Sequence, residues 1–138
     1  MIVLDTNVVS EPLKAKPDPA VLKWLDAQEP ATLYLTTVNL AELLAGIETM
    51  AAGKRRTELK RGLIEQMMPL FDGRILAFDT SAAEAFASIT ASAQAEGNPI
   101  SFADCAIAAI ASANGFLVAT RNVRDFKGTG VALLNPWE

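Results

Sequence analysis

Met1-Ile2-Val3-Leu4-Asp5-Thr6-Asn7 is an apolar run that stops abruptly at a carboxylate. A short apolar run bounded by polar residues is typical of a buried strand. Ligands of open parallel sheets bind at the carboxyl ends of the strands, so Asp5 lies where an active site is expected. The chain contains no histidine, which excludes Ser-His-Asp triads, Cys-His pairs and HExxH zinc sites. The chemistry of this protein therefore depends mostly on Asp and Glu side chains.

Further apolar runs with strand character follow along the chain, and helical patterns fill every gap between them except the last. We expect strands at residues 2–4, 32–36, 74–78, 116–120 and 131–134. We expect helices at residues 7–14, 20–28, around the stripe Leu40, Leu43, Leu44 and Ile47, at 54–68, from a cap at 79–81 through Ala95, and after Ser101. Strands that alternate with helices predict the α/β class, with a mostly parallel sheet covered on both faces.

Composition indicates a single domain over residues 1–138. Of these residues 51% are hydrophobic, enough for a sizeable core. Cys105 is the only cysteine, so an intrachain disulfide and a cysteine-rich zinc site are both excluded, and a reducing compartment is indicated. No apolar stretch is long enough to span a bilayer, and no signal-like segment opens the chain. We expect a soluble cytoplasmic protein.

The net charge of −4 predicts no long-range attraction of polyanions, so any nucleic-acid site must be local. Basic residues gather in two places, at Lys54-Arg55-Arg56 with Lys60-Arg61, and at Arg121 with Arg124. Each group has the charge to hold phosphates. For the first group, a solvated helix face is the favoured interpretation.

Two acids lie on predicted helices. Asp104 sits in an otherwise apolar segment, and its spacing from Ser101 is that of a capping box. A carboxylate in such dry surroundings also needs a cation or hydrogen-bond donors, and both roles are compatible. Glu42 lies opposite the leucine stripe of its helix, where a solvated glutamate is the default. It falls, however, in the second turn after a strand and can lean back toward the strand's carboxyl end.

Polar residues also follow two later strands. Asn122 offers a neutral oxygen that can hold a metal or its water, although turn chemistry explains it too and is favoured for Asp125. An N-cap explains Asp79 more simply. Carboxylates that converge at strand ends repel one another unless a cation lies between them, and ligand oxygens without His or Cys select Mg²⁺ or Mn²⁺. Such ions activate water and neutralise charge on a phosphate, so phosphodiester hydrolysis matches best.

Four segments carry a family resemblance: Leu-Asp-Thr-Asn-Val at Asp5, Val-Asn-Leu-Ala-Glu-Leu at Glu42, Phe-Ala-Asp-Cys-Ala-Ile-Ala-Ala at Asp104, and Ala-Thr-Arg-Asn-Val-Arg-Asp-Phe at Asn122. In this order and spacing the chain resembles a PIN-domain ribonuclease, and more narrowly the VapC toxins of bacterial type II toxin-antitoxin pairs, in their FitB-like branch. The resemblance runs to the terminal Asn135-Pro136-Trp137. It implies a PIN-like three-layer α/β/α fold with a central parallel sheet of about five strands.

The resemblance also implies an acidic pocket in which Asp5, Glu42 and Asp104 hold Mg²⁺ or Mn²⁺. The fourth position, commonly Asp in the family, is Asn122 here, with Asp125 as a partial substitute. Thr6 and Thr120 are expected to hold water beside the metal or to orient the carboxylates, and Arg121 and Arg124 to hold the RNA backbone.

Family members cut RNA at selected sites, usually as homodimers. They are silenced by a VapB-like antitoxin whose C-terminal segment covers the pocket and often inserts an arginine. Leu43, Leu44, Met67 and Met68 suit a partner helix, although ordinary core explains them equally well.

Three other functions are compared with the nuclease. A receiver-like phosphoacceptor fits poorly because no lysine occurs between Lys60 and Lys127, and a haloacid-dehalogenase-like phosphatase would need an acid where Asn7 stands. A binding module without turnover, whose acidic pocket receives a basic partner segment, is kept open by Asn122.

Overall fold

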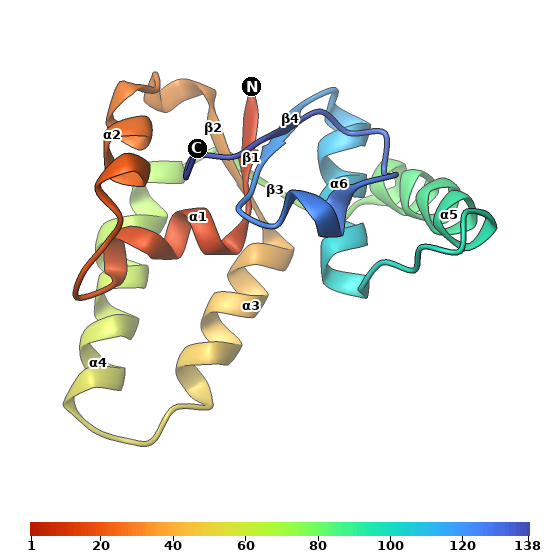
Figure 1. Ribbon diagram of the computed structural model, residues 1–138. Coiled ribbons are helices and arrows are strands. Elements are labelled where there is room, and N and C mark those ends of the chain that lie inside the picture. The colour runs from red at the N-terminus through yellow and green to blue at the C-terminus, as the bar shows by residue number, and fades with distance from the viewer.

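A five-stranded parallel sheet lies between two layers of helices in the computed structural model, which describes all residues 1–138 (Figure 1). The strands are β1 (Ile2–Leu4), β2 (Leu33–Thr36), β3 (Ile75–Leu76), β4 (Leu117–Ala119) and β5 (Leu133–Leu134). Their order is β3-β2-β1-β4-β5, and every neighbouring pair is parallel. The predicted α/β class and all five predicted strands are confirmed, with shorter ladders at β3 and β5.

Six α-helices connect the strands. They are α1 (Thr6–Ser10), α2 (Pro19–Ala27), α3 (Thr37–Glu48), α4 (Lys54–Arg61), α5 (Thr80–Ala95) and α6 (Phe102–Asn114). In Figure 1, α1, α2 and α4 lie on one side of the sheet, and α5 and α6 lie on the other. Short 3-10 or π segments are η1 (Glu11–Leu13), η2 (Pro30–Thr32), η3 (Gly62–Met67), η4 (Met68–Phe71) and η5 (Val123–Phe126).

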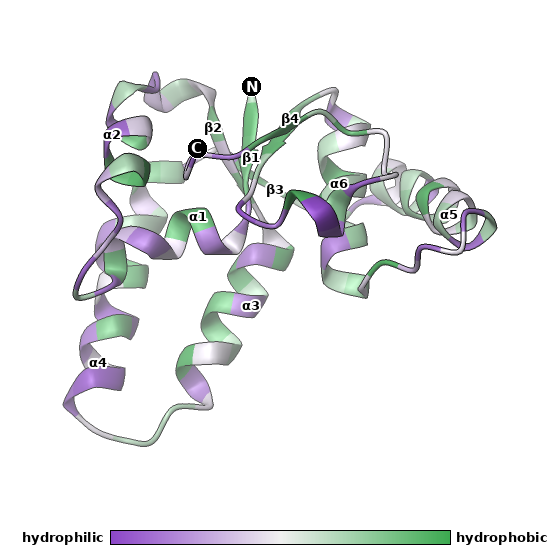
Figure 2. Cartoon of the chain, in the orientation of Figure 1, coloured by the Kyte–Doolittle hydropathy of each residue, from purple (hydrophilic) through white to green (hydrophobic).

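The side chains of β1 alternate between the two faces of the sheet and so contribute to two separate core clusters. Successive strand side chains point to opposite faces, so Ile2 and Leu4 pack among α1, α3 and the segment after α4, whereas Val3 packs against α6. Every residue of α6 from Cys105 to Ala111 is buried. The hydropathy colouring of Figure 2 shows the apolar strands at the centre of the molecule. This arrangement places β1, and with it Asp5, in the middle of the sheet.

The helices differ from prediction where proline and local geometry intervene. The helix expected over residues 7–14 changes to a 3-10 turn at Glu11, because Pro12 has no N–H for an α-helical bond. The helix expected over 54–68 becomes a π-helix at Gly62–Met67 and continues through Pro69 as a 3-10 turn. The last gap, where we predicted no helix, contains η5.

α3 and α4 form an antiparallel pair that projects from the sheet (Figure 1). Glu48 on α3 accepts hydrogen bonds from Lys60 Nζ and Arg56 Nη2 on α4, each at 2.7 Å. These two bonds lower the pKa of Glu48 below its usual value. Two of the five cations in the first basic group therefore join the hairpin, and the group occupies a solvated helix face as favoured. No helix of this chain is long and apolar enough to cross a membrane.

Candidate active site

The carboxyl ends of β1, β2 and β4 meet at one edge of the sheet, because β1 pairs with both of the others. Asp5 follows β1 directly, and its backbone N–H donates to Ala119 O on β4 at 2.9 Å. Thr36 ends β2, and Thr120 follows β4. All three residues are buried, with 4% of Asp5 exposed and none of either threonine. The sheet therefore gathers polar side chains from distant parts of the chain around Asp5.

Three neutral donors hold the carboxylate of Asp5. Its Oδ1 accepts from the backbone N–H of Thr6 at 2.8 Å, which also caps α1. Its Oδ2 accepts from Thr120 Oγ1 at 2.8 Å and from Asn7 Nδ2 at 3.3 Å. Burial raises the pKa of Asp5, and the Thr120 and Thr6 hydrogen bonds partly oppose that rise. Since a carboxylate has about four acceptor sites, the side chain is fixed with capacity left for one ligand.

Glu42 belongs to the same group of side chains. It is exposed, as the default for its helix position predicts, but its Oε1 accepts from Thr6 Oγ1 at 2.7 Å. Thr6 Oγ1 in turn accepts from Asn39 Nδ2 at 3.0 Å. The negative charges of Asp104 and Glu42 add to the rise in the Asp5 pKa, so all three carboxylates act on one another.

Asn39 is a structural residue that we did not predict from sequence. It is fully buried, and its Oδ1 accepts from Thr36 N at 3.0 Å and from Thr36 Oγ1 at 2.7 Å. Its own N–H donates to Thr36 Oγ1, which completes a capping box at the start of α3. The signal was present as a Thr-x-x-Asn spacing directly after a predicted strand. Asn39 thus joins the end of β2 to Thr6 and, through it, to Glu42.

Asp104 combines both roles considered for it. Ser101 Oγ accepts from the Asp104 backbone N–H at 3.2 Å and caps α6, as the spacing predicted. The carboxyl group is half-buried, and burial raises its pKa, with further increases from the charges of Asp125 and Glu42. The helix cap therefore presents Asp104 to the same acidic group.

The fourth side of the site has Asn122 and Asp125, the residue and the partial substitute that the resemblance implied there. Asn122 donates its backbone N–H to Thr120 Oγ1 at 3.0 Å, and its side chain is exposed without a hydrogen bond. Asp125, on η5, is an acid on this side of the site, and its charge, together with that of Glu42, raises the pKa of Asp104. Asp79 caps α5 through a bond from Ala82 N at 3.0 Å, as the simpler explanation predicted.

Arginines lie near this edge without neutralising it. Arg121 donates its backbone N–H to Asn7 Oδ1 at 3.3 Å, and its guanidinium stacks 5.2 Å from the ring of Trp137. Arg124 is exposed on η5. None of the four salt bridges in the protein involves Asp5, Glu42 or Asp104. The three carboxylates keep their negative charge available for another cation.

The donor set fits an open site for a hard metal ion. No three Asp, Glu, Cys or His side chains converge closely enough to hold an ion on their own. Mg²⁺, however, is usually bound through one or two carboxylates, with waters and substrate phosphates as the remaining ligands. Oxygen donors alone, mutual repulsion and the remaining acceptor capacity of Asp5 agree with that arrangement.

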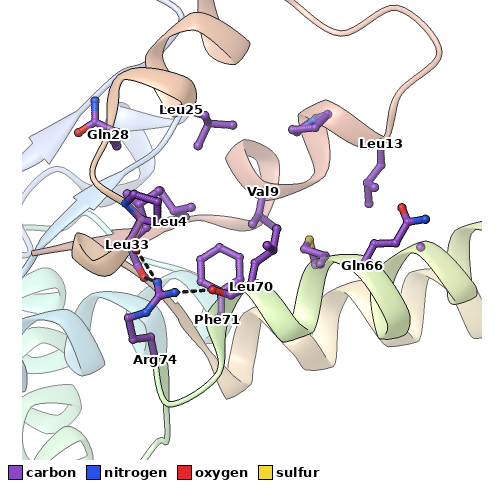
Figure 3. A pocket seen from close by; sticks show the side chains of 14 residues that line it. Leu4, Val9, Leu13, Leu25, Gln28, Leu33, Gln66, Leu70, Phe71 and Arg74 are labelled. Carbon is purple, nitrogen blue, oxygen red and sulfur yellow. Dashed lines mark hydrogen bonds between the residues drawn. The ribbon is translucent and has the colours of Figure 1, made fainter.

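An apolar cavity of about 440 Å³ lies on the α1 side of the sheet. Figure 3 shows Val9, Leu25 and Leu70 converging on it from α1, α2 and η4. Arg74 closes one end, where its guanidinium donates to the carbonyls of Leu33 and Leu70. The four apolar residues considered for a partner helix belong to the core: Met67 is buried, and Leu43, Leu44 and Met68 pack against the same cluster. Met67 also lines the cavity.

Comparison with known proteins agrees with this architecture. The PIN domain family matches residues 2–131. The chain is 49% identical to VapC ribonuclease Y4jK of Sinorhizobium fredii over 138 residues, covering 100% of this chain and 99% of the relative. It is 42% identical to toxin FitB of Neisseria gonorrhoeae over 137 residues, covering 99% of each.

Among solved structures, FitAB bound to the IR36 DNA fragment contains a chain that superposes with a TM-score of 0.96 at 40% identity, covering 100% of this chain and 96% of that one. The family resemblance inferred from the four sequence segments and the three-layer fold are both confirmed. This chain belongs to the PIN-domain family, among the VapC and FitB toxins.

Proposed function

We propose that this protein is the toxin of a toxin-antitoxin pair and acts as an Mg²⁺- or Mn²⁺-dependent endoribonuclease. The observation that carries the proposal is the group of three carboxylates at the sheet edge, Asp5, Glu42 and Asp104, of which Asp5 and Glu42 are held by neutral donors alone. The name of the VapC ribonuclease relative supports RNA as the substrate.

Asp5, Asp104 and Glu42 are the residues that would hold the ion, one or two of them directly and the rest through its waters. When bound, Mg²⁺ supplies charge stabilisation at a phosphate and lowers the pKa of water. Thr120 and Thr6 orient the Asp5 carboxylate, and Thr6 also orients Glu42. Arg121, which Trp137 supports from one side, is placed to hold a backbone phosphate. Asn122 contributes through its backbone bond to Thr120 and offers an exposed amide to the substrate.

The partner in this proposal is an antitoxin. FitB occurs in the solved FitAB complex, and the chain here covers almost the whole of that toxin. The cavity beside α1 and α2 offers apolar surface for a segment of such a partner. A C-terminal antitoxin segment that continues to the acidic edge would block the site through charge, because an arginine there takes the place of the metal ion.

Site-directed variants test the nuclease. Asp5→Asn and Asp104→Asn are expected to lower metal-dependent RNA cleavage by about 100-fold or more while the circular dichroism spectrum stays that of the parent. Asp26→Asn is the matched control, because Asp26 is exposed on α2 and makes no side-chain hydrogen bond or salt bridge. The parent should also arrest bacterial growth and produce discrete new RNA ends. Full cleavage in excess EDTA, or by Asp5→Asn, would overturn the proposal in favour of a binding module.

A further inference from the structure

A second cleft, separate from the apolar cavity, opens beside Glu42. It has a volume of about 310 Å³ and lies between the α1–η1 segment and the α3–α4 hairpin. It is lined by Thr6 and Glu42, which belong to the candidate active site, and by Arg55, the second residue of α4. Leu43 and Met50 provide apolar walls. From Glu42 to the end of α3 at Glu48 the helix rises about 9 Å, so the cleft leads from the acidic edge toward the tip of the hairpin.

Arg55 is the cation that this cleft leaves without an acidic partner. Elsewhere on α4, Arg56 and Lys60 bind Glu48, and Lys54 lies 3.8 Å from Glu58. Across the cleft, Lys14 binds the buried Glu11 at 2.8 Å. Arg61 is the other α4 arginine without a salt bridge, and it lines a different hollow on the far side of the helix. One helix thus carries two free arginines, of which one reaches the cleft of the acidic site.

We propose that this cleft is the subsite for the stretch of RNA that adjoins the scissile phosphate. Arg55 holds a backbone phosphate of that stretch, and Leu43 and Met50 contact the ribose or base between the two phosphates. The inference rests on the proposed nuclease function and adds the path of the strand. Its basis is the order of chemistry along the cleft: carboxylates for a metal-held phosphate, then apolar walls, then a guanidinium with paired donors for a second phosphate.

A peptide segment of an antitoxin fits the same cleft less well. An arginine that reaches Glu42 through this cleft would pass Arg55, which has no acidic partner, and like charges oppose that path. The phosphates of a nucleic-acid strand are attracted to Arg55, and the metal ion of the proposed function would offset the charge of Glu42. Electrostatics therefore favour RNA over a basic peptide as the occupant.

The test compares Arg55→Gln with Arg61→Gln, which removes the same charge from the same helix outside the cleft. Binding of a short labelled single-stranded RNA is followed by fluorescence anisotropy without metal, over a series of salt concentrations. Arg55→Gln should weaken binding about tenfold and reduce the slope of log K against log salt by about 0.7, the value for one phosphate contact on a single strand. With metal present it should raise KM and leave kcat near that of the parent.

Each outcome decides between the two proposals. If the parent cleaves RNA but Arg55→Gln and Arg61→Gln match it in affinity, salt slope and KM, the subsite is wrong and the nuclease stands. If the parent neither binds nor cleaves RNA, the nuclease itself fails. If Arg55→Gln releases the antitoxin while RNA binding is unchanged, the cleft is a peptide site and the inference is overturned.

Discussion

Thr120→Val removes one hydroxyl from the buried edge of the sheet and tests how the acidic site is held. The Thr120 side chain is fully buried, donates to Asp5 Oδ2 at 2.8 Å and accepts from Asn122 N at 3.0 Å. A hydrogen bond to a charged group contributes about 1.5–3 kcal/mol. The new methyl group offsets about 0.8 kcal/mol of that loss. We therefore expect the free energy of unfolding at pH 7 to fall by about 1–2 kcal/mol.

The expected fall in melting temperature follows from the size of the chain. With an unfolding entropy of about 2.1 cal/mol/K per residue, 138 residues give about 290 cal/mol/K, so the midpoint should drop by about 3–7 °C. Thermal melts followed by circular dichroism measure this directly. Thr120→Ser is the control. It keeps the hydroxyl that donates to Asp5, so the part of the fall in melting temperature that comes from losing this hydrogen bond should be absent.

The loss should also depend on pH, with a definite sign. The pKa of Asp5 in the folded protein is raised by burial, and the Thr120 hydrogen bond lowers it again in part. Without that bond the folded pKa rises further, and an acid whose folded pKa lies above its unfolded value loses stability as pH rises through that window. The difference in free energy of unfolding between the parent and Thr120→Val should therefore be largest at pH 7 and smaller near about pH 4. An equal difference at both pH values would refute this account of Asp5.

Two further substitutions give results of opposite sign. Asp104→Asn should raise the melting temperature at pH 7 and leave it unchanged at low pH, because burial and the charges of Asp125 and Glu42 raise the pKa of this carboxyl; melts at the two pH values check it. Asn39→Ala should lower the free energy of unfolding by about 2–3 kcal/mol in urea titrations, because it strips the buried partners of Thr36; a loss below 1 kcal/mol would contradict the network.

Much of the fold was predictable because its determinants are local. The predicted bounds of β1 match the structure, because its three apolar residues are followed directly by the charged Asp5 and so define a short buried strand. The cap of α5 at Asp79 and that of α6 at Ser101 follow from spacing alone. The π-helical segment Gly62–Met67 was not predictable, because the same residues continue an α-helical pattern and the change depends on packing around them.

The candidate site was predictable as a location but not as a network. Asp5 and Thr120 each follow an apolar strand, and parallel strands bring such ends to one edge. The bond between Thr6 and Glu42 spans 36 residues and depends on the direction in which α3 leaves the sheet. Asp125 lies in the turn η5, as pattern alone favoured, and the path of that turn, which pattern did not predict, also sets its charge against Asp104.

Threonine hydroxyls hold the site together, and their chemistry explains why. Each of Thr6, Thr36 and Thr120 donates one hydrogen bond and accepts another, so each joins a donor to an oxygen acceptor in a fixed direction. A lysine or arginine in the same place would orient a carboxylate equally well but would also neutralise it. Neutral donors fix Asp5 and Glu42 while their charge stays uncompensated. Burial of these carboxylates, with their mutual repulsion, destabilises the protein when no cation is bound. The features that make this edge costly to fold are therefore those that make it a candidate site.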